Sequence, residues 1–283
     1  MFSTRFGLIY LQASLILVPC LYQYFFLTTR NMTGKEREIT VAVFTRQGET
    51  LAGLFVKDLS AHGLENIIVI AQKQPKRLIR KGINYIRAYG VQALWRFLKK
   101  RSQALESLTE TDSLRLYPVD SLNSAETEKI LRDNRVDLGV LANTGIIRKN
   151  IIELVPMGII MPHPGILPGY RGINCTGWAI LNGDDIGVTA FLIDQGIDTG
   201  PILLREKLDK GKITSRENLA ESLLRLRIEL VTRSVIGLRD GLLKPVLQKP
   251  DEGRLYTEKM LTAEVKKKMD QALDRLIELN LSH

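Results

Sequence analysis

Two short segments of the chain carry side chains that could move a proton. His163, one of three histidines, is framed by prolines and follows an apolar run at 158–161. Histidine changes its charge near neutral pH, which suits it to acid–base chemistry. A second segment, 194–201, is rich in turn residues and holds Asp198, which could bring a carboxylate to the same place. Taken alone, each residue also fits an ordinary role, as a hydrogen-bonded loop histidine and as a turn aspartate before a glycine.

The apolar run before His163 has the length of a buried strand, so the histidine would lie at the carboxyl end of that strand. In open α/β sheets, ligands bind at this edge. Upstream, β-branched strands alternate with segments of helical spacing. The expected strands span 39–44, 67–71, 114–118 and 136–142, and the expected helices span 50–62 and 124–134. This alternation predicts an α/β fold with a mostly parallel sheet.

The second half of the chain adds further elements. We expect a short helix at 176–182, a strand at 187–193 that could pair with 202–208, and a long helix at 218–238. An amphipathic helix over 263–281 follows an irregular stretch at 245–253. These elements predict a short C-terminal helical extension behind the sheet domain.

The composition is that of a globular protein. At 283 residues, with 45% apolar and 25% charged residues, the chain can form one large domain or two small ones. Cys20 and Cys175 are too few for a disulfide framework and lack the spacing of metal ligands. We therefore expect a reducing compartment and no protein-bound metal.

Lysine and arginine gather in one segment. The chain has 40 Lys and Arg against 31 Asp and Glu, and nine of the cations fall within 76–101, which has no acidic residue. The apolar residues of this stretch predict one or two amphipathic helices, forming a basic helical insertion over 76–107. A local basic stripe favours an anionic partner, either a nucleotide diphosphate, an RNA or a membrane face. A solvated helix face is the ordinary alternative.

The chain begins with a hydrophobic stretch. Residues 7–27 carry no charged side chain, and 21 residues are just enough to cross a bilayer core of roughly 30 Å. The cations that follow, Arg30, Lys35 and Arg37, would then leave the large domain in the cytoplasm, anchored to the inner face of a membrane. The alternative is that residues 1–31 are a misassigned extension upstream of a start at Met32.

Several motifs occur in the order found in one enzyme family. The run His163-Pro164-Gly165-Ile166-Leu167-Pro168-Gly169-Tyr170-Arg171-Gly172 resembles the signature loop of formyltransferases that use 10-formyltetrahydrofolate. The likeness continues through Trp178-Ala179-Ile180, Gly183, Gly187-Val188-Thr189, and Asp194-Gln195-Gly196-Ile197-Asp198-Thr199-Gly200-Pro201-Ile202. Farther on, Gln248, Gly253, Tyr256 and Lys259-Met260 are similar to the segment after the catalytic domain in tRNA- and sugar-directed members.

The resemblance implies a Rossmann-like catalytic domain over 32–245, with an extension over 246–283. It implies transfer of a formyl group from 10-formyltetrahydrofolate to a primary amine, with His163 and Asp198 as the catalytic residues. The histidine would donate a hydrogen bond to the developing oxyanion or a proton to the departing nitrogen, and the aspartate would orient it. The residues expected around the substrate or folate are Asn143, Pro164, Gly165, Leu167, Pro168, Arg171, Gly172 and Gly196.

One position departs from the family pattern. The family places an asparagine two residues before the histidine, where its amide supports the oxyanion, and this chain has Met161 there. A thioether offers no N–H donor, and losing one such donor typically costs ~10²–10³ in turnover. Asn143, at the end of the preceding strand, and Asn174 are the candidates to replace it.

The acceptor amine has three candidates. The chain length fits an amino sugar on a nucleotide best, and an aminoacyl-tRNA or a glycinamide-type amine are the others. Because Met161 removes a donor, two further functions stay open. One is a formyltransferase-like protein with reduced catalysis that binds a ligand or a membrane partner. The other is a hydrolase of formyl-folate, since the same groups could activate water.

Overall fold

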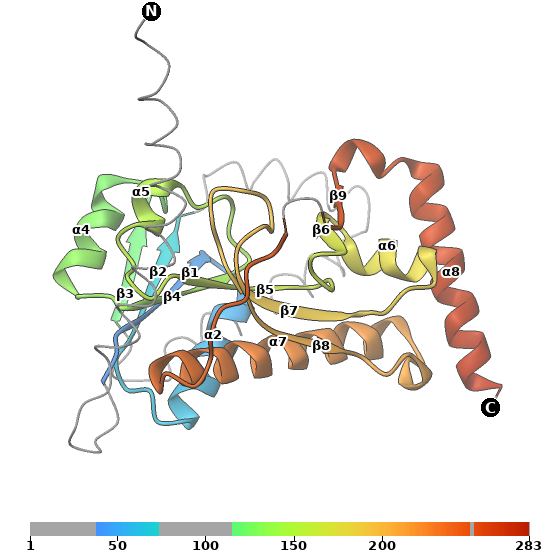
Figure 1. The fold of residues 1–283 in the computed structure, drawn as a ribbon, viewed down its shortest axis with the longest axis horizontal. Coiled ribbons are helices and arrows are strands. Elements are labelled where there is room, and N and C mark those ends of the chain that lie inside the picture. Colours follow the sequence, from blue (N-terminus) through green and yellow to red (C-terminus); the bar gives the residue numbers. More distant parts are fainter. Residues whose placement is uncertain (1–37, 74–114, 250–251, 283) are drawn as a thin grey trace, which may run out of the picture.

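The computed structural model describes residues 38–73, 115–249 and 252–282. The main sheet has seven strands in the order β3-β2-β1-β4-β5-β7-β8, and Figure 1 shows how they lie in the fold. Its strands are β1 (Val41–Arg46), β2 (Ile67–Gln72), β3 (Arg115–Val119), β4 (Leu138–Ala142), β5 (Ile159–His163), β7 (Gly187–Leu192) and β8 (Ile202–Lys207). The first five strands run parallel, whereas β7 and β8 are antiparallel to their neighbours. The predicted α/β fold with a mostly parallel sheet is confirmed.

Helices cover both faces of this sheet. In Figure 1, α2 (Thr50–Ala61) and α7 (Arg216–Arg239) lie on one face, while α4 (Ala125–Asp133) and α5 (Lys149–Ile152) lie on the other. Strands covered on both faces read as continuous apolar runs rather than as alternating patterns. Accordingly, every residue of β4 is buried. Two separate apolar clusters fill the spaces above and below the sheet.

Helix α7 supports the strand that ends at His163. The helix starts after Ser215, whose hydroxyl accepts a hydrogen bond from the Asn218 N–H at 3.0 Å and so caps the first turn. Leu230 and Val235 are fully buried in the core beneath the sheet. Because α7 packs against β5 and β7, its middle turns pass under the end of the sheet that carries the histidine.

A smaller layer packs beside the sheet. Strand β6 (Tyr170–Gly172) pairs in parallel with β9 (Arg254–Tyr256), and α6 (Cys175–Asn182) packs against α8 (Ala263–Leu281). Figure 1 shows α8 crossing the end of α6. The short 3₁₀ turns η1 (Lys210–Lys212) and η2 (Glu258–Met260) complete this part. Helices α6 and α8 match the expected elements, whereas the β6–β9 pair was not predicted.

Strand β5 is longer than the sequence indicated. The expected strand ended at Met161 and left His163 in a loop. In the structure β7 pairs with this end of β5, and His163 lies opposite Thr189. The histidine is therefore the last residue of a strand and takes its position from the sheet.

Two predicted segments, the uncharged stretch 7–27 and the basic insertion 76–107, lie outside the described residues. Within the described ranges, none of the helices combines the length and apolarity needed to cross a bilayer. The division of the chain at residues 31 and 245 stays a prediction.

Candidate active site

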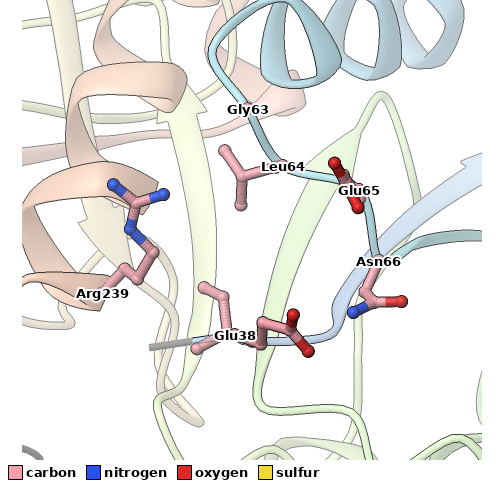
Figure 2. Close-up of a pocket in the computed structure, with 7 residues that line it drawn as sticks. Glu38, Gly63, Leu64, Glu65, Asn66 and Arg239 are labelled. Carbon is pink, nitrogen blue, oxygen red and sulfur yellow. The ribbon is translucent and has the colours of Figure 1, made fainter. Parts of the chain in front are cut away.

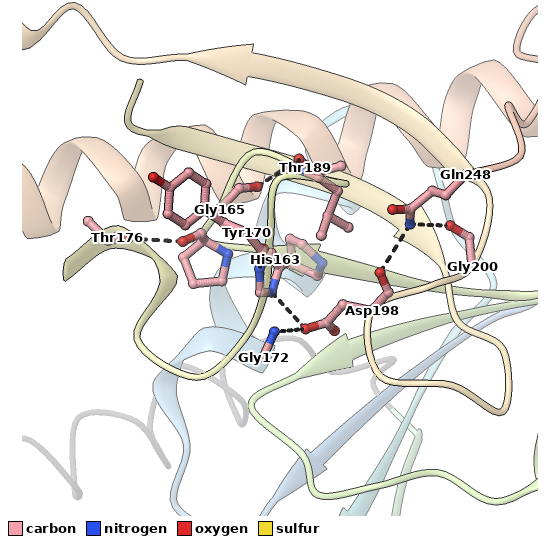
Figure 3. Close-up of polar contacts among 12 residues, drawn as sticks. His163, Gly165, Tyr170, Gly172, Thr176, Thr189, Asp198, Gly200 and Gln248 are labelled. Carbon is pink, nitrogen blue, oxygen red and sulfur yellow. Dashed lines mark hydrogen bonds and ion pairs between the residues drawn. The ribbon is translucent and has the colours of Figure 1, made fainter. Parts of the chain in front are cut away.

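His163 lies at the carboxyl end of β5, with its side chain 2% exposed. Its Nε2 atom is 2.8 Å from the carbonyl oxygen of Tyr170, and its Nδ1 atom is 3.5 Å from Oδ2 of Asp198 (Figure 3). A carbonyl only accepts hydrogen bonds, so Nε2 carries a proton. A neutral ring then presents the lone pair of Nδ1 to the carboxylate. Protonation of Nδ1 would turn this contact into an ion pair.

Asp198 reaches the histidine from the loop between β7 and β8. Its carboxylate oxygen Oδ2 accepts a hydrogen bond from the Gly172 N–H at 2.7 Å. The residue adopts φ 54°, in the left-handed region that non-glycine residues rarely occupy. This backbone turns the carboxylate toward His163, and the Gly172 amide fixes it there. The structure thus brings together both predicted catalytic residues and Gly172.

The surroundings of His163 both raise and lower its pKa. Burial lowers the pKa of His163 below the usual 6.5. The Asp198 carboxylate and the Tyr170 carbonyl act against burial and raise this pKa, while the positive charge of Arg227 lowers it further. The net effect is a lowered pKa, so the ring gives up its proton more readily than a free imidazole.

Side chains from neighbouring elements hold the loop after His163. The Thr189 hydroxyl donates to the Gly165 carbonyl at 2.7 Å and accepts from the Leu167 N–H at 3.0 Å. The Thr176 hydroxyl donates to the Pro164 carbonyl at 2.9 Å. An Arg205 guanidinium N–H donates to the Leu167 carbonyl at 2.8 Å. Figure 3 shows the Thr176 and Thr189 contacts beside His163. The four hydrogen bonds together restrain the loop.

Gly165 is required by packing as well as by the turn. A Cβ at this position would lie 2.7 Å from Cβ of Cys175 and 2.8 Å from Nε2 of His163. A serine at this position would therefore push the imidazole aside in this structure. Burial also raises the pKa of the Cys175 thiol to about 12. The thiol stays protonated at neutral pH and is a poor nucleophile.

Met161, two residues before His163, is half-buried and packs beside Leu167, Phe191 and Ile202. Asn143 and Asn174 are the candidates to replace the missing amide donor, and the side-chain hydrogen bonds that each donates go to groups other than the histidine. Asn143 donates to Oε2 of Glu49 at 3.2 Å. Asn174 donates to the sulfur of Met269 at 3.3 Å. Their role as a replacement donor stays a prediction.

Sequence reasoning missed Arg227, which α7 places beside the site. Its Nε donates to the Pro162 carbonyl at 3.2 Å, and Nη2 donates to Oδ1 of Asn143 at 3.0 Å. With the Asn143–Glu49 bond, these contacts join the carboxyl ends of β1, β4 and β5. No motif marks this arginine, since it stands within an ordinary long helix. Only the packing of α7 under β5 identifies it.

The other predicted site residues fall into two groups. Pro164, Leu167 and Pro168 lie on the loop between β5 and β6. Arg171 lies within β6, and its buried Nε has no hydrogen-bond partner among the described residues. Gly196 lies in an exposed turn, where its N–H donates to Asp194 at 2.9 Å. Within the described ranges, no group of three or more His, Cys, Asp or Glu side chains could hold a metal ion.

A separate pocket lies at the opposite edge of the sheet (Figure 2). Its lining includes Glu38 and Glu65 at the amino ends of β1 and β2, and Arg239 at the end of α7. Arg239 Nε is 2.7 Å from Oδ1 of Asp240. Because His163 and Asp198 gather at the carboxyl edge, this pocket does not belong to the candidate active site.

Comparisons with known proteins agree on the family. Residues 40–235 match the family model described as formyl transferase. The methionyl-tRNA formyltransferase of Thermodesulfovibrio yellowstonii is 38% identical over 117 residues, which cover 41% of this chain and 37% of that protein. The match therefore spans less than half the length of this relative.

Solved structures share the fold at lower identity. Glycinamide ribonucleotide transformylase 1 from Symbiobacterium toebii is 18% identical with a TM-score of 0.54, covering 77% of this chain and 99% of that chain. The N-formyltransferase from Helicobacter canadensis, in complex with folinic acid and dTDP-3-aminofucose, is 14% identical with a TM-score of 0.54, covering 83% and 80%. At these identities the likeness shows the fold alone.

Proposed function

Because the chain belongs to the formyl transferase family, we propose that it transfers a formyl group from 10-formyltetrahydrofolate to the amine of an amino sugar carried on a nucleotide. The observation that carries this proposal is the pairing of Asp198 with His163 at 3.5 Å, at the edge of the sheet where ligands bind. Both are buried, and a hydrogen bond from Gly172 orients the carboxylate.

The pair has the groups that formyl transfer needs. A bond forms between the amine nitrogen and the formyl carbon, the bond from that carbon to the folate nitrogen breaks, and a proton passes from the first nitrogen to the second. Asp198 binds Gly172 through Oδ2, while Oδ1 takes part in no hydrogen bond of the described residues. We assign Oδ1 as the acceptor of the amine proton. His163 stabilises the protonated pair through Nδ1, and its lowered pKa favours passing the proton on.

The residues beside Asp198 fit a folate donor. Ile173 and Ile197 stay 47% and 54% exposed although they adjoin Gly172 and Asp198, which are hydrogen-bonded to each other. Flat ring systems pack well on such apolar side chains. The buried Nε of Arg171, without a partner among the described residues, offers a donor close by. When bound, 10-formyltetrahydrofolate supplies the formyl carbon, and these three residues would hold it.

The acceptor is proposed from the charges on the other side of His163. Arg227, Asn143 and Glu49 form a connected polar row at the carboxyl edge, and exposed Arg46 ends β1 at the same edge. Arginine binds phosphate oxygens with two parallel N–H bonds. Carboxylate and amide groups suit the hydroxyls of a sugar. A nucleotide-linked amino sugar presents both kinds of group to this row.

The test mixes the full chain with 10-formyltetrahydrofolate and one of three acceptors: an amino-sugar dTDP conjugate, glycinamide ribonucleotide or methionyl-tRNA. Mass spectrometry identifies the formylated product, and Asp198→Asn is the matched control. We expect formylation of the sugar nucleotide by the parent and none by the variant. Exclusive formylation of either other acceptor would overturn the choice of amine. Formate release without any acceptor, or no turnover at all, would overturn formyl transfer.

A further inference from the structure

The catalytic aspartate is held from outside the region that matches the family. Gln248 follows the sheet domain, yet its side-chain Nε2 donates to the carbonyl of Asp198 at 3.1 Å and to the carbonyl of Gly200 at 2.7 Å. Figure 3 shows this amide reaching the loop from the side opposite His163. One bond holds Asp198 itself and the other holds Gly200, two residues later. Asp198 has a left-handed φ of 54°, which needs support from its surroundings.

Hydrogen-bond chemistry selects the orientation of this amide. The other assignment of oxygen and nitrogen would set Oε1 against two carbonyl oxygens, and none of the three could donate. In the orientation observed, Oε1 is buried and has no hydrogen-bond partner in the described part of the chain. Native proteins rarely leave a buried acceptor in this condition. Within the described residues, only the donor end of the amide is used.

Gln248 belongs to a segment that contacts both site loops. We call residues 246–249 and 252–256 the C-terminal strap. At its start, Val246 and Ile202 exchange two main-chain hydrogen bonds of 2.8 Å. At its end, the Arg254 N–H donates to the Gly169 carbonyl at 3.0 Å, and the Tyr256 carbonyl accepts from the Ile173 N–H at 2.9 Å. The strap thus touches the loop of His163 as well as the loop of Asp198.

The approach is close enough to exclude side chains. A Cβ on Gly253 would lie 1.6 Å from the Pro168 carbonyl oxygen, and one on Gly172 would lie 2.2 Å from the Tyr256 carbonyl oxygen. Gly172 is also the residue whose N–H binds Asp198. The strap therefore acts on the carboxylate from two directions, through Gln248 on its main chain and through β9 on its hydrogen-bond donor.

We propose that Gln248 is a positioning residue for Asp198, and that the C-terminal strap completes the active site by holding its two loops in register. The role in catalysis rests on the proposed function. The positional role rests only on the contacts described. Without the Gln248 donor, the carbonyls of Asp198 and Gly200 lose their common partner. The left-handed turn then relaxes, and the carboxylate moves away from His163.

The direct test follows the titration of His163 by NMR in the full chain. The chain has three histidines, and His163→Gln identifies the signal. Because Asp198 raises the pKa of His163, a displaced carboxylate lets this pKa fall. We expect the midpoint to fall by about 0.5 pH unit in Gln248→Met. Asp198→Asn should give the largest fall of the His163 midpoint, because it removes the carboxylate charge altogether.

Asn280→Leu is the matched control. Its Nδ2 also donates to two main-chain carbonyls, those of Lys210 and Ile213, at 2.7 and 2.8 Å. It lies in α8, away from the two loops. An unchanged midpoint in this variant, beside a lowered one in Gln248→Met, supports positioning. Equal shifts in both variants, or no shift in a folded Gln248→Met, overturn it. If Gln248→Met does not fold, Gln248→Asn, which retracts the amide by one methylene, should show a smaller fall of the same sign.

Turnover gives the second readout. With an acceptor that the parent formylates, Gln248→Met should lower kcat about tenfold and leave KM for the amine within about twofold, because the base moves while the acceptor row does not. An unchanged kcat overturns the role in catalysis. The titration needs no turnover, so a parent without activity would refute the proposed function and leave the positional test intact.

Discussion

The loop that follows His163 and the loop that carries Asp198 are built in opposite ways. The first begins at a buried strand and is tied by hydrogen bonds from Thr176, Thr189 and Arg205. The second is an excursion between β7 and β8, with an exposed Ile197 and a left-handed Asp198. Its described side-chain supports are the Gln248 amide and an exposed Asp194–Thr199 pair.

This difference assigns different tasks to the two members of the pair. His163 is buried and its loop is held by several hydrogen bonds. We therefore expect its position and its surroundings to stay constant. Asp198 is held by few contacts, and one of them comes from the C-terminal strap, so small changes can move it. A non-glycine residue held in the left-handed region costs about 1–3 kcal/mol. Such conformations occur most often at functional sites.

The largest effects are expected when the side chain of His163 or of Asp198 is removed. We expect Asp198→Ala and His163→Ala both to lower turnover by about 10²–10⁴, the range for a lost proton-transfer group. Stability should separate them. His163→Ala opens a cavity under a loop where the side chain is 2% exposed and should cost about 2–4 kcal/mol of unfolding free energy. Asp198→Ala should cost less than half of that.

Activity assays and denaturant unfolding on the same preparations check this expectation. Equal losses of stability in the two variants would show that the loop of Asp198 is as rigid as the loop of His163.

The second test concerns Met161, which stands where the resemblance in sequence predicts an asparagine. Met161→Asn should raise turnover by about 10²-fold, because one oxyanion donor is worth about that much. Single-turnover measurement of the formylated product checks this. An unchanged rate would mean that another group already supplies the donor. Met161→Leu controls for the altered packing beside Phe191 and Ile202.

The third test compares the threonines of the two loops. In Thr189→Val, the Leu167 N–H and the Gly165 carbonyl lose a buried partner, which should cost about 2–3 kcal/mol. In Thr199→Val the lost bonds are to the exposed Asp194 carboxylate, which can turn to water. We expect a cost under about 1 kcal/mol, measured by urea unfolding. Similar costs in the two variants would contradict the proposed difference in rigidity.

The fold was predictable from the sequence because its signals are local. Fully apolar strands such as β4 and the helical spacing of α7 indicated their elements directly. The end of β5 was not predictable, since His163 extends the strand only through antiparallel pairing with Thr189. The β6–β9 pair was not predicted either, because it also depends on pairing between segments that are distant in sequence. Each of its strands has only three residues.

The residues of the site also differ in whether their signal in the sequence is local. Motifs predicted His163, Asp198 and the glycines as site residues, because these residue types and spacings are unusual in a short segment. Arg227 was missed, since an arginine in a long helix has no distinguishing pattern until α7 is packed under β5. Gln248 was noticed only as part of a resemblance. Its bonds to Asp198 and Gly200 depend on tertiary contact across the edge of β8.

The smallest predicted effect concerns Arg227, whose charge reaches the rigid member of the pair. Burial and the Arg227 charge both lower the pKa of His163 below 6.5. In the unfolded chain the histidine therefore binds more protons just below pH 6.5 than it does in the folded chain. Stability should fall as pH drops through this window toward the lowered folded pKa. Arg227→Met removes one cause of the lowering, so the His163 midpoint should rise by about 0.5 pH unit, and the acid-induced loss of stability should shrink. NMR titration and unfolding at several pH values measure both quantities. A midpoint that falls in Arg227→Met would mean that the lost bond to the Pro162 carbonyl outweighs the lost charge, and that the frame around His163 is less rigid than its contacts indicate.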